Sequence, residues 1–301
     1  MKPIFAVAIV AAALFVGGCA TRMSDKLQSS YGTAAVTEEV TMEYRVYLPP
    51  GYESDAGRSY PLMVYFHGGG GSHRTWGKKG GLGEIALPYM EREEFGPFIV
   101  LSPTVGEMEI ITGEAERTLM QDVIPRVQAS YRTNGTTVAF GHSMGGLHAL
   151  MLSLRHPEAF DAVAAASPFV FDVSPYQDAA TQQEFERRYG GGFFLGRWQD
   201  GVEDVFGNQR EFEAHSPFEL IRRADSRRVN FPLFLTSGTR DQMGLFPQNE
   251  RLHEELKQRG IAHEWVVQEG VGHSTVALPQ MYDWLHRQAT QKGLVSTGGG
   301  R

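Results

Sequence analysis

The chain has 301 residues, of which 42% are hydrophobic and 21% are charged, so it carries enough apolar material for one substantial core. Its formal net charge of -7 and its lack of a Lys/Arg stripe or a nucleic-acid motif exclude a basic face for phosphate backbones. We therefore expect one large domain that does not bind nucleic acid.

The N-terminus has the pattern of an export signal. Lys2 precedes the apolar run Ile4–Val16, which is shorter than the roughly 20 residues of a membrane-spanning helix. We expect residues 1–18 to be a cleaved signal peptide and residues 19–35 to be a polar tether.

Cys19 indicates how the exported chain is held. The stretch VGGC resembles the lipobox of bacterial lipoproteins, in which cleavage before the cysteine is followed by its lipidation. Ala20 resembles the outer-membrane sorting signal of Gram-negative bacteria. The resemblance implies a lipid anchor at Cys19 in the outer membrane, facing the periplasm, and an ordinary secretory signal is the alternative. Cys19 is also the only cysteine, which excludes an intramolecular disulfide.

Along the rest of the chain, apolar runs typical of buried strands are separated by stretches with helical spacing. This alternation predicts an α/β fold with a doubly wound, mostly parallel sheet over residues 36–290, followed by a disordered tail, 291–301. In the first half of the chain we expect strands in 40–52, 61–71 and 97–103, a helix in 82–93 and a helix in 116–131 that Pro125 interrupts. A strand at 136–140 and a helix ending near Pro157 follow. In the second half we expect strands at 161–168, 231–238 and 263–270, with helices at 247–260 and 276–289.

The segment GHSMGG, residues 141–146, places Ser143 between glycines. Random placement of the chain's 35 glycines around its serines gives about 0.2 matches to Gly-x-Ser-x-Gly, so the pattern alone is weak. Its position strengthens it, because the segment follows the predicted strand at 136–140 and begins a predicted helix, as a nucleophile elbow requires. We predict that Ser143 is a catalytic nucleophile.

A serine hydroxyl needs a base, and the base needs an acid that orients it. Asp241 follows the predicted strand at 231–238, and His273 follows the predicted strand at 263–270. Both residues therefore lie at the carboxyl ends of strands, in the chain order nucleophile, acid, histidine. We predict Asp241 as the acid and His273 as the base.

Other candidates fit these roles less well. Asp225 precedes its strand, which puts it at the wrong end of the sheet, and Glu269 lies close to the end of the histidine's own strand. His142 and His148 flank the turn, where packing or a supporting hydrogen bond suits them better than proton transfer.

The oxyanion of an attacked ester needs at least two hydrogen-bond donors. One predicted donor is the backbone N–H of Met144, directly after the nucleophile. The other lies in the glycine loop HGGGGS, residues 67–72, where we predict Gly69 or Gly68. A flexible loop and a phosphate cradle are the alternatives, and the missing Gly-Lys-Ser/Thr ending argues against the cradle.

Histidines flank this glycine loop at His67 and His73. Neither an HExxH motif nor a dense carboxylate cluster accompanies them, and two such histidines alone do not make a metal site. We therefore expect no metal ion.

These features together resemble the putative esterase family of α/β-hydrolases, which includes esterase D, feruloyl esterases, siderophore esterases and mycolyltransferases. The resemblance implies an α/β-hydrolase sheet without a cofactor, a triad of Ser143, Asp241 and His273, and an oxyanion hole formed by Met144 and the glycine loop. The likeness is carried, in family order from about residue 44 to 275, by VYLPPGY, YFHGGGGSHRTW, QDVIPRVQASYRT, GHSMGGLHALMLSLRHPEAFDAVAAASP, SGTRD and GVGHS.

Residues 172 to about 218 form a long, aromatic-rich insertion relative to the compact pattern of this family. In α/β-hydrolases an insertion at this point usually caps the active site, so the resemblance implies that some of its aromatics wall a substrate pocket. We predict Phe194 and Trp198 of the insertion, together with Trp76 after the glycine loop, as pocket residues. The alternative is that the insertion's aromatics form a small core of their own.

The sequence thus predicts a serine esterase that cleaves carboxylic esters through an acyl-enzyme. Feruloyl, acetyl and siderophore esters are the candidate substrates, either as small molecules or linked to a polysaccharide. Two alternatives stay open: an acyltransferase with the same triad, and a non-catalytic lipoprotein on a hydrolase scaffold.

Overall fold

The structure of the chain is a computed structural model. It describes residues 27–291 except 80, 92–96, 108, 175, 177, 182, 184–205, 207, 225–228 and 274–277. The predicted signal peptide, Cys19, the start of the tether, Phe194, Trp198 and nearly all of the predicted tail lie outside the described residues. Export and lipidation at Cys19 therefore stay predictions from the sequence.

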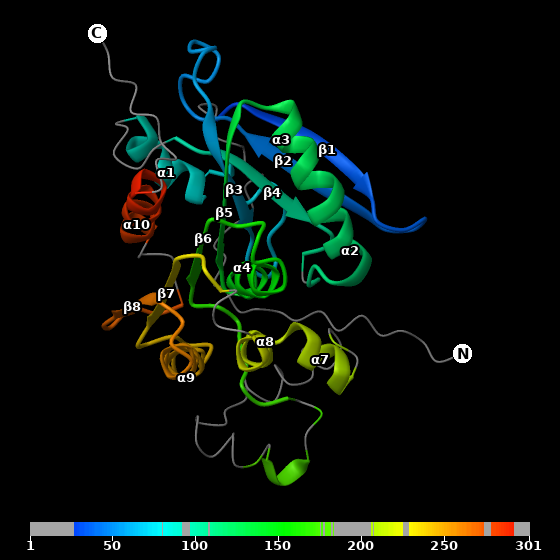
Figure 1. The fold of residues 1–301 in the computed structure, drawn as a ribbon, viewed down its shortest axis with the longest axis vertical. Helices are drawn as coiled ribbons and strands as arrows, with labels where there is room; N and C mark the ends of the chain where they lie inside the picture. The colour runs from blue at the N-terminus through cyan, green and yellow to red at the C-terminus, as the bar shows by residue number, and fades with distance from the viewer. Residues whose placement is uncertain are drawn as a thin grey trace.

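One eight-stranded sheet runs through the domain (Figure 1). Its strands are β1 (Ser29–Ala35), β2 (Thr41–Tyr47), β3 (Tyr60–Phe66), β4 (Ile99–Thr104), β5 (Thr133–His142), β6 (Ala162–Ala166), β7 (Leu233–Gly238) and β8 (His263–Gln268). They lie in the order β1-β2-β4-β3-β5-β6-β7-β8. β2 pairs antiparallel with β1 and with β4, and the other neighbouring pairs are parallel. The predicted α/β fold with a mostly parallel sheet is confirmed.

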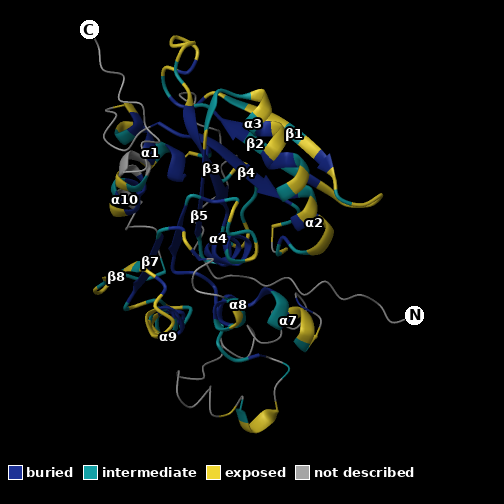
Figure 2. Ribbon diagram, in the orientation of Figure 1, coloured by how far each residue is buried: buried dark blue, intermediate teal, exposed yellow. Residues whose placement is uncertain are grey.

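Helices cover both faces of the sheet, and the central strands β3, β4, β6 and β7 are buried between them (Figure 2). The helices are α1 (Leu82–Glu91), α2 (Gly113–Thr118), α3 (Ile124–Ser130), α4 (Met144–Arg155), α7 (Gln209–His215), α8 (Pro217–Arg223), α9 (Phe246–Gln258) and α10 (Leu278–Gln291). α1 and α10 share one core cluster with the sheet, while α2, α3, α4, α7, α8 and α9 share the other. Every residue of β3 is buried because both of its faces are covered, which explains its continuous apolar run.

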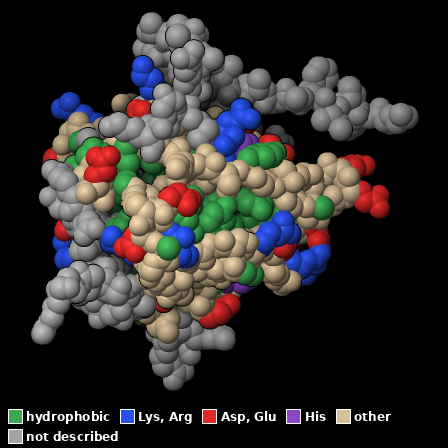
Figure 3. All heavy atoms as spheres, turned by 90° about the horizontal axis from the view of Figure 1, so that it is seen from above, with side chains coloured by type: hydrophobic (Ala, Val, Ile, Leu, Met, Phe, Trp, Pro, Cys, Tyr) green, Lys and Arg blue, Asp and Glu red, His purple; other side chains and the backbone are tan. Residues whose placement is uncertain are grey.

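The surface carries mixed charges. On the face that Figure 3 shows, Lys and Arg side chains are interspersed with Asp and Glu, and hydrophobic side chains lie between them. No helix in the described part of the chain is both long enough and apolar enough to cross a bilayer.

β1 corrects the predicted tether. Residues 29–35 fall in the segment 19–35, yet they form a strand that pairs along its length with β2, beginning with Ser29 opposite Tyr47. Only Ala34 of this strand is buried, so the segment lacks the apolar alternation that predicts a strand. Backbone hydrogen bonds to the sheet edge supply the missing stabilisation.

The helix predicted over 116–131 consists of three pieces. α2 is followed by a π-helical turn at Leu119–Val123 and then by α3, in which Pro125 occupies the first turn. Proline has no N–H to donate to the preceding turn, so a wider turn before it keeps the chain helical. The prediction that Pro125 interrupts this helix is confirmed.

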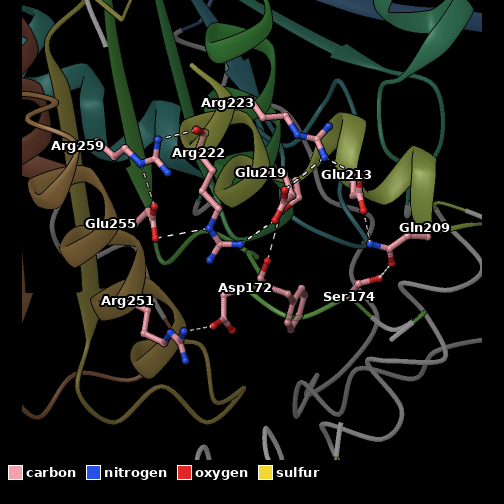
Figure 4. A network of polar contacts seen from close by, with 12 residues as sticks. Asp172, Ser174, Gln209, Glu213, Glu219, Arg222, Arg223, Arg251, Glu255 and Arg259 are labelled. Atoms are coloured by element: carbon pink, nitrogen blue, oxygen red, sulfur yellow. Dashed lines mark hydrogen bonds and ion pairs between the residues drawn. The ribbon is translucent and has the colours of Figure 1, made fainter. Parts of the chain in front are cut away.

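A polar network fastens the start of the insertion to the helices that follow it (Figure 4). Asp172, whose side chain is almost fully buried, forms an ion pair with Arg251 of α9 at 2.5 Å. Arg222 of α8 lies 3.6 Å from Glu255 of α9, so these two helices are linked as well. The first residues of the insertion are therefore held against the rest of the domain.

The described aromatic rings of the insertion pack into a core. Phe206 and Phe212 are both buried, and their rings meet edge-on with centroids 5.5 Å apart. Tyr176 is partly buried against the same cluster. This cluster is the one that α2, α3, α4, α7, α8 and α9 share with the sheet, so these three residues extend the main core and do not form a separate small core of the insertion. A pocket role for Phe194 and Trp198 stays a prediction.

A buried carboxylate joins three helices. Glu116 of α2 is almost fully buried and accepts hydrogen bonds from Arg155 of α4 and from the adjacent His156, each at 2.7 Å. His215 of α7 lies 3.9 Å from its other oxygen. Burial raises the pKa of Glu116, but the hydrogen bonds from His156 and Arg155 outweigh it, and the pKa falls below its ordinary value of 4.5.

Replacing Glu116 by glutamine is expected to lower the free energy of unfolding by about 2 kcal/mol at pH 7, because a charge-assisted buried network is lost. A carboxylate with a lowered pKa stabilises the fold above pH 4.5, and this contribution is lost as the pH falls through the folded-state pKa. The difference in the free energy of unfolding between wild type and Glu116→Gln, measured with urea, should therefore shrink below pH 4.5. A difference that stays constant from pH 7 to pH 3 would contradict the assignment.

Candidate active site

The turn between β5 and α4 carries Ser143. Its φ of 58° and ψ of −123° put it in a region that residues other than glycine rarely adopt. Its N–H donates to the carbonyl of Ala166 at 2.9 Å, and its own carbonyl accepts from the N–H of Phe169 at 3.0 Å. The loop after β6 thus holds a sharp turn between strand and helix, which is the geometry of a nucleophile elbow.

Glycines make this turn sterically feasible. A Cβ on Gly141 would overlap the carbonyl of Gly145, and a Cβ on Gly145 would overlap the carbonyl of Phe66 at the end of β3. On Gly146 the added atom would lie 2.9 Å from Cα of Pro168. The motif needs small residues because its turn packs closely against the backbone on both sides.

Asp241 and His273 meet beyond the carboxyl ends of β7 and β8. The distance between His273 Nδ1 and Asp241 Oδ2 is 2.7 Å, and Asp241 Oδ1 accepts from the N–H of Met243 at 2.8 Å. The aspartate side chain is fully buried, whereas 13% of the histidine side chain is exposed. Because an ionised carboxylate only accepts, Nδ1 donates the proton of this hydrogen bond and leaves Nε2 as an acceptor.

Contacts between the two loops hold this pair together. Gly238 approaches the carbonyl of Val271 so closely that a Cβ would overlap it, and the N–H of Arg240 donates to the same carbonyl at 2.9 Å. Gln242 Oε1 accepts from the N–H of His273 at 3.0 Å. Sequence analysis missed Gln242, because no local pattern indicates a contact between loops 31 residues apart.

One alternative acid, Glu269, does not take this position. Glu269 is exposed and accepts from Thr239 Oγ1 at 3.3 Å. Asp225 lies outside the described residues.

The ring of His273 lies against the serine's own turn. It contacts His142, with ring centroids 4.6 Å apart and an angle of 42° between the planes. Among the described residues, the hydroxyl of Ser143 and the ring of His273 are not hydrogen-bonded to each other. Such bonds are often long in unliganded enzymes and shorten when substrate binds.

The glycine loop after β3 lies beside the elbow. A Cβ built on Gly68 would be 3.7 Å from Cβ of Ser143 and 3.4 Å from the carbonyl oxygen of His142. The loop and the serine therefore border the same space at the carboxyl edge of the sheet, which is the arrangement that the predicted oxyanion hole requires.

Backbone N–H groups of this loop divide into two sets. Gly70 donates to the loop after β4 at 2.8 Å, and Gly71 donates to the carbonyl of Gly68 at 3.0 Å. Within the part of the chain that the structure describes, the N–H groups of Gly68, Gly69 and Met144 have no acceptor. Met144 is one predicted donor and Gly68 and Gly69 are the candidates for the other, so all of these N–H groups are available to an oxyanion.

Both histidines that flank the glycine loop are buried inside the protein. His67 Nδ1 lies 2.9 Å from the carbonyl of Gly68 and its Nε2 lies 3.0 Å from Thr104 Oγ1. Burial lowers the pKa of His67 and of His73. The described residues contain no group of three or more His, Cys, Asp or Glu side chains that could hold a metal ion.

His148 of α4 supports the loop after β4. Its Nε2 accepts from the N–H of Ile111 at 3.0 Å, which places the ring proton on Nδ1. Burial, and to a smaller degree the charge of His67, lower the pKa of His148 to about 3, so its ring is neutral. His148 thus makes the supporting hydrogen bond expected for it.

Trp76 is a predicted pocket residue that the structure places elsewhere. Only 1% of it is exposed, and its ring packs against Tyr65 at 5.0 Å and Tyr282 at 6.4 Å between centroids. These residues belong to the core cluster shared with α1 and α10. Trp76 follows the glycine loop in sequence, but its side chain completes the core and does not line a pocket.

Comparison with known proteins gives a family match and related folds. The family model described as "Putative esterase" matches residues 36–284. An endo-1,4-beta-xylanase/feruloyl esterase from Xylanibacter ruminicola is 29% identical over 129 residues, which cover 38% of this chain and 18% of that protein. The chain therefore spans less than a fifth of that relative's length.

Solved structures share the fold. A ferulic acid esterase matches with a TM-score of 0.65 at 18% identity, covering 87% of this chain and 99% of that chain. An S-formylglutathione hydrolase from Agrobacterium tumefaciens matches with a TM-score of 0.60 at 17% identity, covering 89% of this chain and 98% of that chain. At these identities the likeness establishes the fold alone, which is that of the α/β-hydrolases.

Proposed function

The chain belongs to the putative esterase family, and we propose that this carboxylic ester hydrolase acts through an acyl-enzyme formed on Ser143. The observation that carries the proposal is the strained Ser143, with φ 58°, at the carboxyl edge where the Asp241–His273 pair also lies. Backbone strain of this kind persists only where the surrounding structure enforces it, and it is common at reacting residues.

In the proposed mechanism, His273 Nε2 takes the proton of the Ser143 hydroxyl as its oxygen attacks the ester carbonyl. Asp241 keeps the Nδ1 proton of His273 in place and stabilises the imidazolium that forms. The oxyanion is bound by the N–H groups of Met144 and of Gly69 or Gly68.

Collapse of the tetrahedral intermediate expels the alcohol, which takes the proton from His273 Nε2. Water then enters, gives a proton to the same nitrogen and attacks the acyl carbonyl. The bond between the acyl carbon and the Ser143 oxygen breaks, that oxygen takes the proton back from Nε2, and the carboxylic acid leaves. The helix α4 begins at Met144, so its N-terminus favours the developing negative charge.

For the substrate, we propose esters of hydroxycinnamic acids such as ferulate. The support is that feruloyl or ferulic acid esterase is the name of both the curated relative from Xylanibacter ruminicola and a solved structure of the same fold. Phe169, whose N–H donates to the carbonyl of Ser143, contacts Phe171 edge-on at 4.7 Å between ring centroids, so aromatic side chains pack beside the turn. Acetyl and siderophore esters are the competing substrates.

A matched pair of substrates tests both parts of the proposal. Methyl ferulate and methyl butyrate release the same alcohol, so a difference in kcat/KM reports the acyl pocket. We expect methyl ferulate to be preferred by about 10-fold or more, since an aromatic acyl group fills a larger apolar surface. In parallel, a fluorophosphonate probe should label the peptide that contains Ser143, and mass spectrometry locates the adduct.

Each part of the proposal can be rejected by a different result. Equal kcat/KM for the two methyl esters would reject the hydroxycinnamate class while leaving the nucleophile in place. An adduct on another residue would reject Ser143. Feruloyl glycerol as the main product in glycerol-containing buffer would show an acyltransferase in place of a hydrolase.

A further inference from the structure

His142 borders three parts of the proposed site. It directly precedes Ser143, its ring contacts that of His273 at 4.6 Å between centroids, and its carbonyl and Nδ1 lie 3.4 and 3.8 Å from a Cβ built on Gly68. The mechanism proposed above assigns it no step. A side chain that meets nucleophile, base and oxyanion loop at once is well placed to control their relative geometry.

The ring of His142 is neutral. Burial and then the charge of His273 lower the pKa of His142 to about 3, so it does not gain a proton at the pH at which an esterase works. Two titratable groups contact the proposed base: the ring of His142 and the hydrogen-bonded carboxylate of Asp241. A neutral neighbour adds no repulsion when His273 becomes an imidazolium.

Hydrogen bonds do not explain why His142 occupies this place. Its Nε2 is buried without a partner among the described residues, which destabilises the fold. What the ring does contact is the imidazole of His273. Strand pairing with Ala166 fixes its backbone, and the ring contact with His273 is what its side chain contributes.

We propose that His142 is a positioning residue, whose ring face limits the rotation of the His273 imidazole so that Nδ1 stays on Asp241 and Nε2 faces Ser143. This inference rests on the proposed function of the triad. The hydrogen bond to Asp241 holds one edge of the ring, but rotation about the last side-chain bond of histidine is soft, so one contact leaves the plane of the ring free. A second contact on the face of the ring removes that freedom.

Two variants separate the ring face from the volume it fills. His142→Leu fills the space without a flat face, and His142→Phe keeps the face while removing the unpartnered nitrogen. Because misplacing a catalytic group by about 1 Å costs about 100-fold in rate, we expect kcat of the leucine variant to fall about 10- to 100-fold, with KM changed less than about 2-fold. The phenylalanine variant should keep kcat within about 3-fold of wild type.

A spectroscopic readout distinguishes positioning from folding. The Nδ1 proton of a histidine bonded to a buried carboxylate gives a far-downfield NMR signal, which we expect in wild type and His142→Phe and not in His142→Leu. His253→Ala is the matched control, because it removes a ring that stacks on Trp265 at 5.5 Å in a cluster without Ser143 or His273. It should leave both kcat and the downfield signal unchanged.

Wild-type kcat in the leucine variant would overturn the proposal, and so would a phenylalanine variant that falls as far as the leucine variant. If His142→Leu does not fold, His142→Ala replaces it, and its comparison with His142→Phe decides in the same way. Labelling of Ser143 by the fluorophosphonate distinguishes a failure of the proposed function from a failure of the proposed role of His142. If wild type is not labelled at Ser143, the proposed function fails; if it is labelled and the variants miss these expectations, only the role of His142 fails.

Discussion

A Ser143→Ala variant is expected to lose ester hydrolysis by a factor on the order of 10⁴ or more while folding as wild type does. Without the hydroxyl there is no acyl-enzyme, and His273 and the oxyanion donors can assist only a direct attack by water. The stability should change little, because alanine meets the same backbone strain at φ 58° and the hydroxyl of Ser143 forms no hydrogen bond within the described residues. Initial rates with methyl ferulate and p-nitrophenyl acetate measure the loss, and urea unfolding measures the stability.

Ser153→Ala is the matched control for this experiment. Ser153 lies on α4, the helix that begins after Ser143, and its hydroxyl is buried without a partner in the described part of the chain. Removing it should leave the rate unchanged and the stability equal or slightly higher. If Ser143→Ala retained more than about a tenth of wild-type activity, the acyl-enzyme mechanism would have to be abandoned.

The central strands were predictable because the apolar side chains that stabilise them form a continuous run in the sequence. β3 and β4 are buried along their whole length between two helical layers, so a continuous apolar run is what the fold requires of them. β1 shows the opposite case. It buries only Ala34 and is held by backbone pairing with β2, and such pairing leaves no pattern in the side chains.

The proposed site likewise contains residues that the sequence predicts and contacts that it does not. Ser143, Asp241 and His273 could be chosen because each follows a strand that is recognisable locally, and parallel strands bring their carboxyl ends to one edge. Contacts between loops could not be predicted, as Gln242 on the backbone of His273 and the ring of His142 on the same residue both show. They depend on how chain segments far apart in the sequence meet in space.

Replacing Gly145 by alanine is expected to destabilise the protein by more than about 4 kcal/mol, so that little folded enzyme is recovered. The added methyl group would overlap the backbone carbonyl of Phe66 and lie 2.8 Å from the carbonyl of His67. Neither atom belongs to a flexible side chain, so relief requires moving α4 away from the end of β3. That movement would also pull Met144 and the glycine loop apart, which separates the two sides of the proposed oxyanion hole.

Gly135→Ala on β5 separates this overlap from the general cost of losing a glycine. Gly135 has a φ of 86°, so alanine there is strained, but nothing lies within 4 Å of the added atom. Its expected cost is about 1–2 kcal/mol, with fluorophosphonate labelling of Ser143 unchanged. Urea unfolding of the soluble fraction compares the two variants directly. Because Gly145 has no positive φ in the structure, a cost as small as that of Gly135→Ala would mean that α4 does not approach β3 this closely. The close approach of Gly145 to Phe66 and of Gly146 to Pro168 thus explains why the motif ends in two glycines, whatever the chemistry of Ser143.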